Sequence, residues 1–210
     1  MTEDAKDDTQ GMDDEANLVR RLSEGDEGAL EPLLERHLAG LRAFVRARAG
    51  PLLRGREDDA DIVQSVCREI LVHRERFQVP AEGGFKRWLF LSALRKIQNR
   101  REYWLAQKRD VGRDVRAPGV PGASSASDVD LLAGYGTLCT PSRELMAREA
   151  VERVERAIDA LPEDYREALT LSRMVGLKRA EIAEVMGKSE GAVRMLLSRA
   201  QARLVELLEE

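Results

Sequence analysis

Side chains able to hydrogen-bond to DNA are concentrated near the end of the 210-residue chain, in the stretch KSEGAVRMLLSRAQAR over 188–203. At 3.6 residues per helical turn, Val193, Leu197, Ala200 and Leu204 form one apolar stripe, so polar residues take the opposite side. The candidate DNA contacts at the start of this helix and on its polar side are Lys188, Ser189, Glu190, Arg194, Met195, Ser198, Arg199 and Arg203. Arginine can donate two hydrogen bonds to guanine and serine can bond a base or a phosphate, which indicates a helix that enters the major groove.

The residues just before this helix have the spacing of a helix-turn-helix. Ala183, Gly187 and Val193 stand four and then six residues apart. The motif needs a small residue where two helices touch, a glycine at the turn and an apolar anchor for the second helix. We expect helices over about 162–174, 178–186 and 189–204, separated by Gly176 and Gly187, with the Ser189 hydroxyl capping the last one.

The same residues also fit a plainer interpretation. An amphipathic helix with basic residues on its polar side is most often a solvated helix of a bundle. The helix-turn-helix spacing and the small residues Gly191, Ser198 and Ala202, which let a backbone approach DNA, favour the DNA-binding interpretation.

A second basic region lies in the middle of the chain. Between Lys86 and Arg116 ten basic residues face three acidic ones, and Tyr103 and Trp104 lie among them. The candidate contacts to single-stranded DNA are Lys86, Arg95, Lys96, Arg100, Arg101, Tyr103 and Trp104. Cations neutralise phosphates and aromatic rings stack on unpaired bases. Composition equally allows a solvated basic face with both rings packed on neighbouring helices, and Trp88 is predicted to be a core residue.

The composition bounds the fold and the class of protein. Aromatic residues at 4% and charged residues at 34%, with sustained helical periodicity, predict an all-α chain of small modules. The net charge of −4 argues weakly against nucleic acid, but the charge is segregated along the chain. Two cysteines, Cys67 and Cys139, and two histidines predict no disulfide framework, metal site or cofactor. The absence of catalytic motifs predicts a protein that is not an enzyme, and the absence of a signal peptide or spanning segment predicts a cytoplasmic one without membrane insertion.

Two helical domains joined by a flexible linker are the expected architecture. The predicted divisions are a disordered acidic tail over 1–15, a helical domain over 16–112, a linker over 113–139 and a second helical domain over 140–210. The first domain should hold a helix over about 57–76 with an acidic, exposed first turn, a loop over 77–84 and a helix from near Phe85. The second should begin with a helix at Thr140-Pro141.

The order of several stretches resembles the extracytoplasmic-function (ECF) sigma factors of the sigma-70 family. The resemblance covers 17–208 and rests on LVRRLSEGDEGALEPLLERHLAGL, DDADIVQSVCREIL, FKRWLFLSALRKIQNRR and, after the linker, LPEDYREALTLSRMVGLKRAEIAEVMGKSEGAVRMLLSRAQARL. It implies a sigma2-like bundle and a sigma4-like helix-turn-helix domain. The implied partners are the RNA polymerase core with its beta and beta-prime subunits, promoter DNA and, as in many relatives, an anti-sigma factor.

The resemblance also implies roles for particular residues. The helix over 57–76 would dock on the clamp helices of the largest polymerase subunit through Asp58, Asp61, Ile62, Gln64 and Ser65. The loop over 77–84 and the start of the next helix would capture a flipped base of the −10 element. The basic helix would hold the upstream duplex and the melting strand through Lys96, Asn99, Arg100 and Arg101, and the helix over 189–204 would read the −35 element. Ser65, Cys67, Arg95 and Asn99 depart from the residues that are frequent there in the family.

Two other functions fit parts of the sequence. A dimeric helix-turn-helix regulator with a helical effector domain would bind a palindrome tightly without polymerase. A helical adaptor with no DNA role would leave the basic segment and the helix-turn-helix spacing unexplained.

Overall fold

The computed structural model describes residues 4–73, 84–109 and 145–209, and all its regular elements in these ranges are helical. This confirms the predicted all-α class. Residues 77–83 of the loop predicted over 77–84, the predicted linker over 113–139 and the predicted helix start at Thr140-Pro141 lie outside the described residues, and Gly84 is the first residue of a helix.

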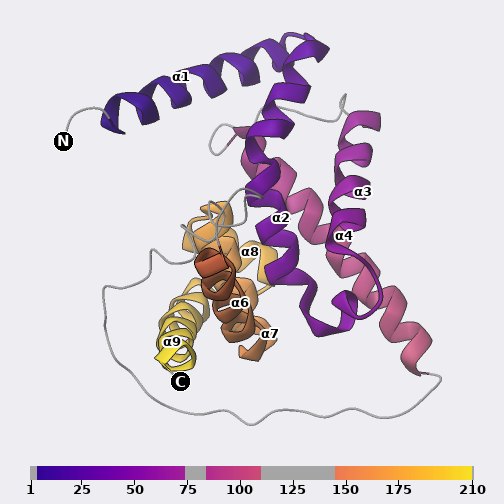
Figure 1. Ribbon diagram of the computed structural model, residues 1–210, viewed down its shortest axis with the longest axis vertical. Helices are drawn as coiled ribbons and strands as arrows, with labels where there is room; N and C mark the ends of the chain where they lie inside the picture. Colours follow the sequence, from indigo (N-terminus) through magenta and orange to yellow (C-terminus); the bar gives the residue numbers. More distant parts are fainter. Residues whose placement is uncertain (1–3, 74–83, 110–144, 210) are drawn as a thin grey trace.

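The N-terminal half is a bundle of helices. Its elements are α1 (Asp4–Ser23), the short 3-10 helix η1 (Glu27–Ala29), α2 (Leu30–Arg54), α3 (Asp59–Val72) and α4 (Gly84–Arg109). In Figure 1, α2, α3 and α4 run beside one another and α1 extends away from them. Phe44 of α2, Ile62 of α3 and Phe90 of α4 are among the fully buried side chains of their core.

The chain is helical earlier than the sequence indicated. Helix α1 begins at Asp4, within the segment over 1–15 that was predicted to be a disordered tail. Acidic residues gather in the first half of this helix and Arg20 and Arg21 occupy its last turn, an order that complements the helix dipole. The composition of the segment hid this local preference.

Helix α2 is kinked at Gly50. Its φ of 64° is a left-handed conformation that glycine adopts without strain. A Cβ atom at this position would also come within 2.7 Å of Nη1 of Arg166, a residue of the C-terminal half. Gly50 therefore lets the two halves of the molecule approach each other.

The C-terminal half contains α6 (Leu145–Ala160), α7 (Glu163–Thr170), the π-helical turn η3 (Leu171–Val175), α8 (Arg179–Met186) and α9 (Glu190–Glu209). Ile158, Leu169, Ile182 and Val193 are buried in its core. Helices α6 and α7 pack on α2, and η3 contacts α4. The two helical halves thus lie directly against each other (Figure 1).

Candidate nucleic-acid interface

The predicted helix-turn-helix is formed by α8 and α9. Gly187 links them in a left-handed conformation with φ 63° and ψ 35°, which explains why a glycine stands there. The Ser189 hydroxyl accepts a hydrogen bond from the Ala192 amide at 3.2 Å. The start of α8 is held by the reverse contact, in which the Lys178 backbone amide donates to the Glu181 carboxylate at 2.7 Å. These boundaries and the Ser189 cap confirm the local predictions.

Helix α9 is divided into a buried and an exposed side as its periodicity predicts. Val193, Ala200 and Leu204 are at most 2% exposed. The candidate DNA contacts that are exposed are Ser189, Glu190, Arg194, Met195, Ser198 and Arg199. Two further candidates are half-buried and engaged in ion pairs: Lys188 with Asp164 of α7 at 3.0 Å, and Arg203 with Glu206 at 2.9 Å. Five of these six exposed residues are polar or charged, and the sixth, Met195, is apolar.

The basic helix α4 carries its candidate residues in different environments. Arg95 and Asn99 are exposed, whereas the Lys96 ammonium lies 2.7 Å from the Glu69 carboxylate of α3. The half-buried Lys86 ammonium stands 5.9 Å from the centre of the Phe90 ring. Thus the basic segment is not one continuous row of solvated cations.

The carboxylate of Glu57 binds two side chains in the C-terminal part of α4. It accepts hydrogen bonds from Arg100 and, at 2.7 Å, from the Trp104 indole. Trp104 is half-buried against the core and Arg56 lies over its ring at 5.2 Å, whereas the Tyr103 ring is 57% exposed. The two aromatic residues therefore differ: Tyr103 offers a ring face for stacking, and Trp104 is largely occupied within the protein.

Arg101 turns towards the C-terminal half, where it forms an ion pair with Glu163 of α7. Neither Glu57 nor Glu163 was predicted to matter for the basic segment. Both contacts join residues distant in the sequence, and no local pattern of residue types announces them.

Helix α3 presents most of its predicted docking residues to solvent. Asp58 caps the helix by accepting a hydrogen bond from the Ala60 amide at 2.9 Å. Asp58, Asp61 and Gln64 are exposed, and Ser65 is half-buried. Ile62 corrects the prediction: its side chain is 0% exposed, so it packs in the core and offers no surface to a partner.

Two residues outside the interface keep a structural role. Trp88 packs against the core, with its ring 5.8 Å from that of Phe85, as its predicted core role requires. Cys67 is half-buried, and burial raises the pKa of its thiol, which keeps it protonated and unreactive. Cys139 lies outside the described residues.

Across residues 4–73, 84–109 and 145–209, we find no helix with the length and apolar character needed to cross a membrane.

Comparisons with known proteins match both halves of the chain. A family model described as sigma-70 region 4 matches residues 151–204, which contain α7, η3, α8 and most of α9. The ECF RNA polymerase sigma-E factor of Haemophilus influenzae is 31% identical over 187 residues, which cover 88% of this chain and 89% of that protein. The RNA polymerase sigma factor NccH of Alcaligenes xylosoxydans xylosoxydans is 30% identical over 93% of this chain and 95% of its own length.

Solved structures show the same fold at lower identity. CnrH in complex with the cytosolic domain of CnrY gives a TM-score of 0.53 at 21% identity, covering 93% of this chain and 97% of that one. The sigma factor RpoE of Bartonella quintana, in complex with the anti-sigma factor NepR, gives 0.56 at 20% identity and covers 85% and 96%. With relatives of about 30% identity over nearly its whole length and the helix-turn-helix in place, the chain belongs to the ECF RNA polymerase sigma factors of the sigma-70 family.

Proposed function

We propose that this sigma factor divides promoter recognition among three surfaces. The exposed residues of α9 read the −35 element, the basic side of α4 with Tyr103 holds the −10 element as it melts, and the exposed residues of α3 dock on the polymerase core. The main support is that α8, Gly187 and α9 form a helix-turn-helix whose second helix exposes its polar side to solvent. The N-terminal bundle over 16–112 and the C-terminal domain over 140–210 act as separate recognition units.

The exposed chemistry of each surface suits its target. Arg194, Ser198 and Arg199 stand on one outward side of α9, where guanidinium and hydroxyl groups can reach base edges and phosphates. On α4 the exposed Arg95, Asn99 and Tyr103 combine a cation, an amide and a ring, which is the combination that binds single strands. Asp61 and Gln64 give α3 a polar docking face that does not depend on the buried Ile62.

An anti-sigma factor is a further proposed partner. Its support is that the sigma factor RpoE of Bartonella quintana, which has the same fold, is in complex with the anti-sigma factor NepR. A sigma factor that works with the polymerase core also has its place of action in the cytoplasm.

Site-specific photo-crosslinking in the complete promoter complex tests the division. A photoreactive amino acid is placed singly at Gln64, Tyr103 or Arg199, all of them exposed, with Glu152 of α6 as the control position. We expect Gln64 to crosslink to the largest polymerase subunit, Tyr103 to the −10 region and Arg199 to the −35 region. Crosslinks of Arg199 to the −10 region, or of Gln64 to DNA alone, would contradict the assignment. Strong crosslinking of Arg199 to a palindrome without polymerase would favour an autonomous regulator.

A further inference from the structure

The outward side of α9 carries one long apolar side chain among polar ones. Within the described residues of α6 to α9, Met195 is the only large apolar side chain that is strongly exposed, at 47%. Val193, Ala200 and Leu204 of the same helix are at most 2% exposed. A single exposed apolar residue is common on protein surfaces, so what Met195 can do depends on its surroundings.

Met195 stands near the middle of the outward side. Residues three and four apart are neighbours on a helix surface, so Met195 lies beside Gly191 on the preceding turn and Ser198 on the next. Both neighbours are small and exposed. A Cβ atom added at Gly191 would meet nothing within 4 Å, which shows open space over this part of the helix. Met195 therefore carries the longest side chain at the centre of a surface that a partner can approach.

Two arginines flank Met195 on opposite sides. At about 100° per residue, Arg194 points about 100° to one side of Met195 and Arg199 about 40° to the other. Both arginines are exposed. Guanidinium groups bind phosphates and the major-groove edge of guanine, so these two would hold this side of α9 in the groove with Met195 between them.

A thioether side chain can recognise only one feature of the major groove. Its sulfur is at most a weak hydrogen-bond acceptor, so it cannot pair with the donors and acceptors that distinguish guanine, adenine and cytosine. Thymine differs by a methyl group at C5, which an apolar side chain can cover. Covering the polar edge of another base would remove its water without a replacement hydrogen bond, which costs free energy.

We propose that Met195 selects a thymine in the −35 element by contact with its C5 methyl group, at a position between the bases or phosphates that Arg194 and Arg199 contact. This inference rests on the proposed reading of the −35 element by α9 and names the chemistry of one of its bases. The two arginines supply affinity, and Met195 supplies a preference that needs no hydrogen bond.

The methyl contact should have a modest and measurable effect. A methyl group is close in size to the methylene group whose burial changes an equilibrium constant about fourfold. Methionine is unbranched and has three rotatable side-chain bonds, so it can follow the methyl group without a change in the position of α9.

Deoxyuridine tests the contact because it differs from thymidine only by lacking the C5 methyl group. Holoenzyme assembled from core polymerase and the full-length chain is bound to promoter duplexes in which each −35 thymidine, on either strand, is replaced in turn by deoxyuridine. We expect one position at which the replacement weakens binding about fourfold. A cytosine placed there should bind more tightly, by a similar factor, when it carries a C5 methyl group.

Variants of the exposed Met195 separate base contact from a structural role. Met195→Ala should abolish the difference between thymidine and deoxyuridine, and Met195→Leu should retain it because leucine is also apolar. Met195→Gln should shift the preference towards adenine, since an amide can bond adenine N6 and N7. Arg194→Ala is the matched control: it should weaken binding but leave the ratio between thymidine and deoxyuridine within about 1.5-fold of its original value.

Two results would overturn the inference. One is equal binding of thymidine and deoxyuridine at every −35 position, and the other is a thymidine preference that survives in Met195→Ala. If binding still depends on other −35 bases in these cases, the proposed function stands without the methyl contact. If binding does not depend on the −35 sequence at all, the proposed reading by α9 fails and the inference fails with it.

Discussion

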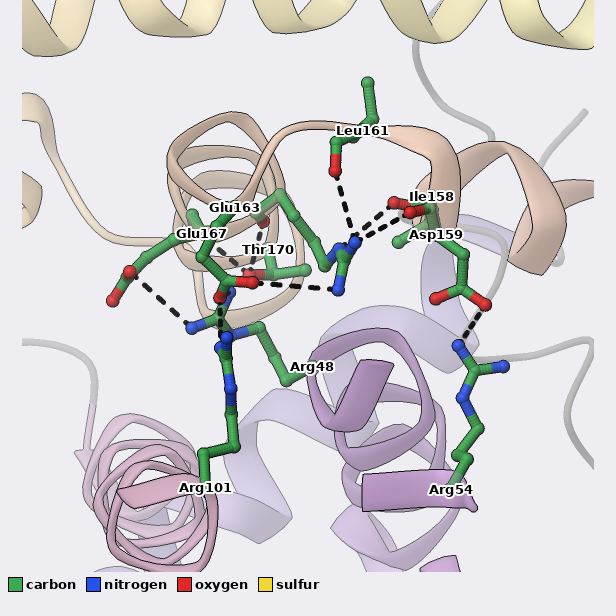
Figure 2. Close-up of polar contacts among 10 residues, drawn as sticks. Arg48, Arg54, Arg101, Ile158, Asp159, Leu161, Glu163, Glu167 and Thr170 are labelled. Carbon is green, nitrogen blue, oxygen red and sulfur yellow. Dashed lines mark hydrogen bonds and ion pairs between the residues drawn. The ribbon is translucent and has the colours of Figure 1, made fainter. Parts of the chain in front are cut away.

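Arg48 and Glu163 stand 115 residues apart in the sequence, yet the guanidinium of one donates to the carboxylate of the other at 3.1 Å in the middle of the molecule. Arg48 reaches Glu163 and Glu167 with different nitrogens, which a planar guanidinium does and a single ammonium does not. Arg48 of α2 therefore contacts two carboxylates of α7 across the boundary between the two halves (Figure 2).

Replacing Arg48 by lysine should weaken the contact between the two halves while keeping the charge. Arg48→Lys cannot bridge both carboxylates at once, so we expect this contact to lose about 1 to 2 kcal/mol. The measurement is energy transfer at low salt between dyes on Glu35→Cys of α2 and Glu184→Cys of α8, both exposed positions, in a Cys67→Ser, Cys139→Ala background. Unchanged energy transfer in Arg48→Lys would show that charge alone, without the two hydrogen-bonding nitrogens, holds the halves together.

Arg166 should be essential to the C-terminal half for a different reason. This buried side chain donates to the carbonyl oxygens of Ile158 at 3.1 Å, Asp159 at 2.8 Å and Leu161 at 3.1 Å, and so satisfies the end of α6. Arg166→Ala should lower the free energy of unfolding by about 2 to 3 kcal/mol, measured by urea denaturation. The exposed Arg173→Ala is the control; a loss no larger than that of the control would mean that water replaces the guanidinium.

The stability of the N-terminal half should depend on pH through His37. Burial lowers the pKa of His37 despite the hydrogen-bonded Glu15 at 3.1 Å, which pulls the other way, while Lys86 and Arg36 add to the lowering. The unfolded chain then binds a proton below about pH 6.5 before the folded one does, so stability should fall as the pH drops through this value towards the lowered pKa.

Urea denaturation between about pH 7 and about pH 5 measures this loss, and His37→Gln should flatten the pH profile. The chain has only two histidines, so His73→Gln is the natural control. If the pH profile of stability flattens equally in His73→Gln, the pH dependence does not come from His37.

Arg194 should determine sequence preference at the −35 element. It is exposed on the outward side of α9, so its removal leaves the core intact. Arg194→Ala should weaken promoter use by about 1 to 3 kcal/mol and alter the preferred bases if the guanidinium reads a base edge. Competition among −35 variants in transcription measures both effects, with Arg20→Ala on α1 as the control. A loss of promoter use without a change in the preferred −35 bases would indicate that Arg194 contacts phosphates instead.

The double change Asp61→Lys, Gln64→Ala should abolish binding to the polymerase core without unfolding α3. Both side chains are exposed, so helix content should stay the same while the docking surface changes its charge and shape. Co-purification with core polymerase is the measurement, and Glu35→Lys on α2 is the control. If the double variant binds the polymerase core as strongly as the unchanged protein, α3 is not the docking surface.

Local signals in the sequence were sufficient to predict the helix-turn-helix. Gly187 is in the left-handed conformation that a tight turn needs, and Ser189 caps the next helix, both readable from residue type and spacing. Ile62 shows the limit of a family motif, which marks a position without telling whether its side chain faces a partner or the core. Its burial depends on the packing of three helices.

Contacts between segments that are distant in the chain could not be predicted from the sequence. The basic segment suggested free cations, but Glu57 holds Arg100 and Trp104, and Glu163 holds Arg101, from 43 or more residues away. Carboxylates recur every four residues along α6 and α7, at Glu155, Asp159, Glu163 and Glu167. An acidic helix face is ordinarily solvated, so only the packing reveals their partners.

Run-off transcription with purified core polymerase, with and without this protein, tests the central claim most directly. The templates are a library of upstream sequences from its own genome, read by mapping the starts. We predict new, protein-dependent starts that share −35 and −10 sequences at a fixed separation. The account would be contradicted by the absence of such starts, together with tight binding of the protein alone to a palindrome.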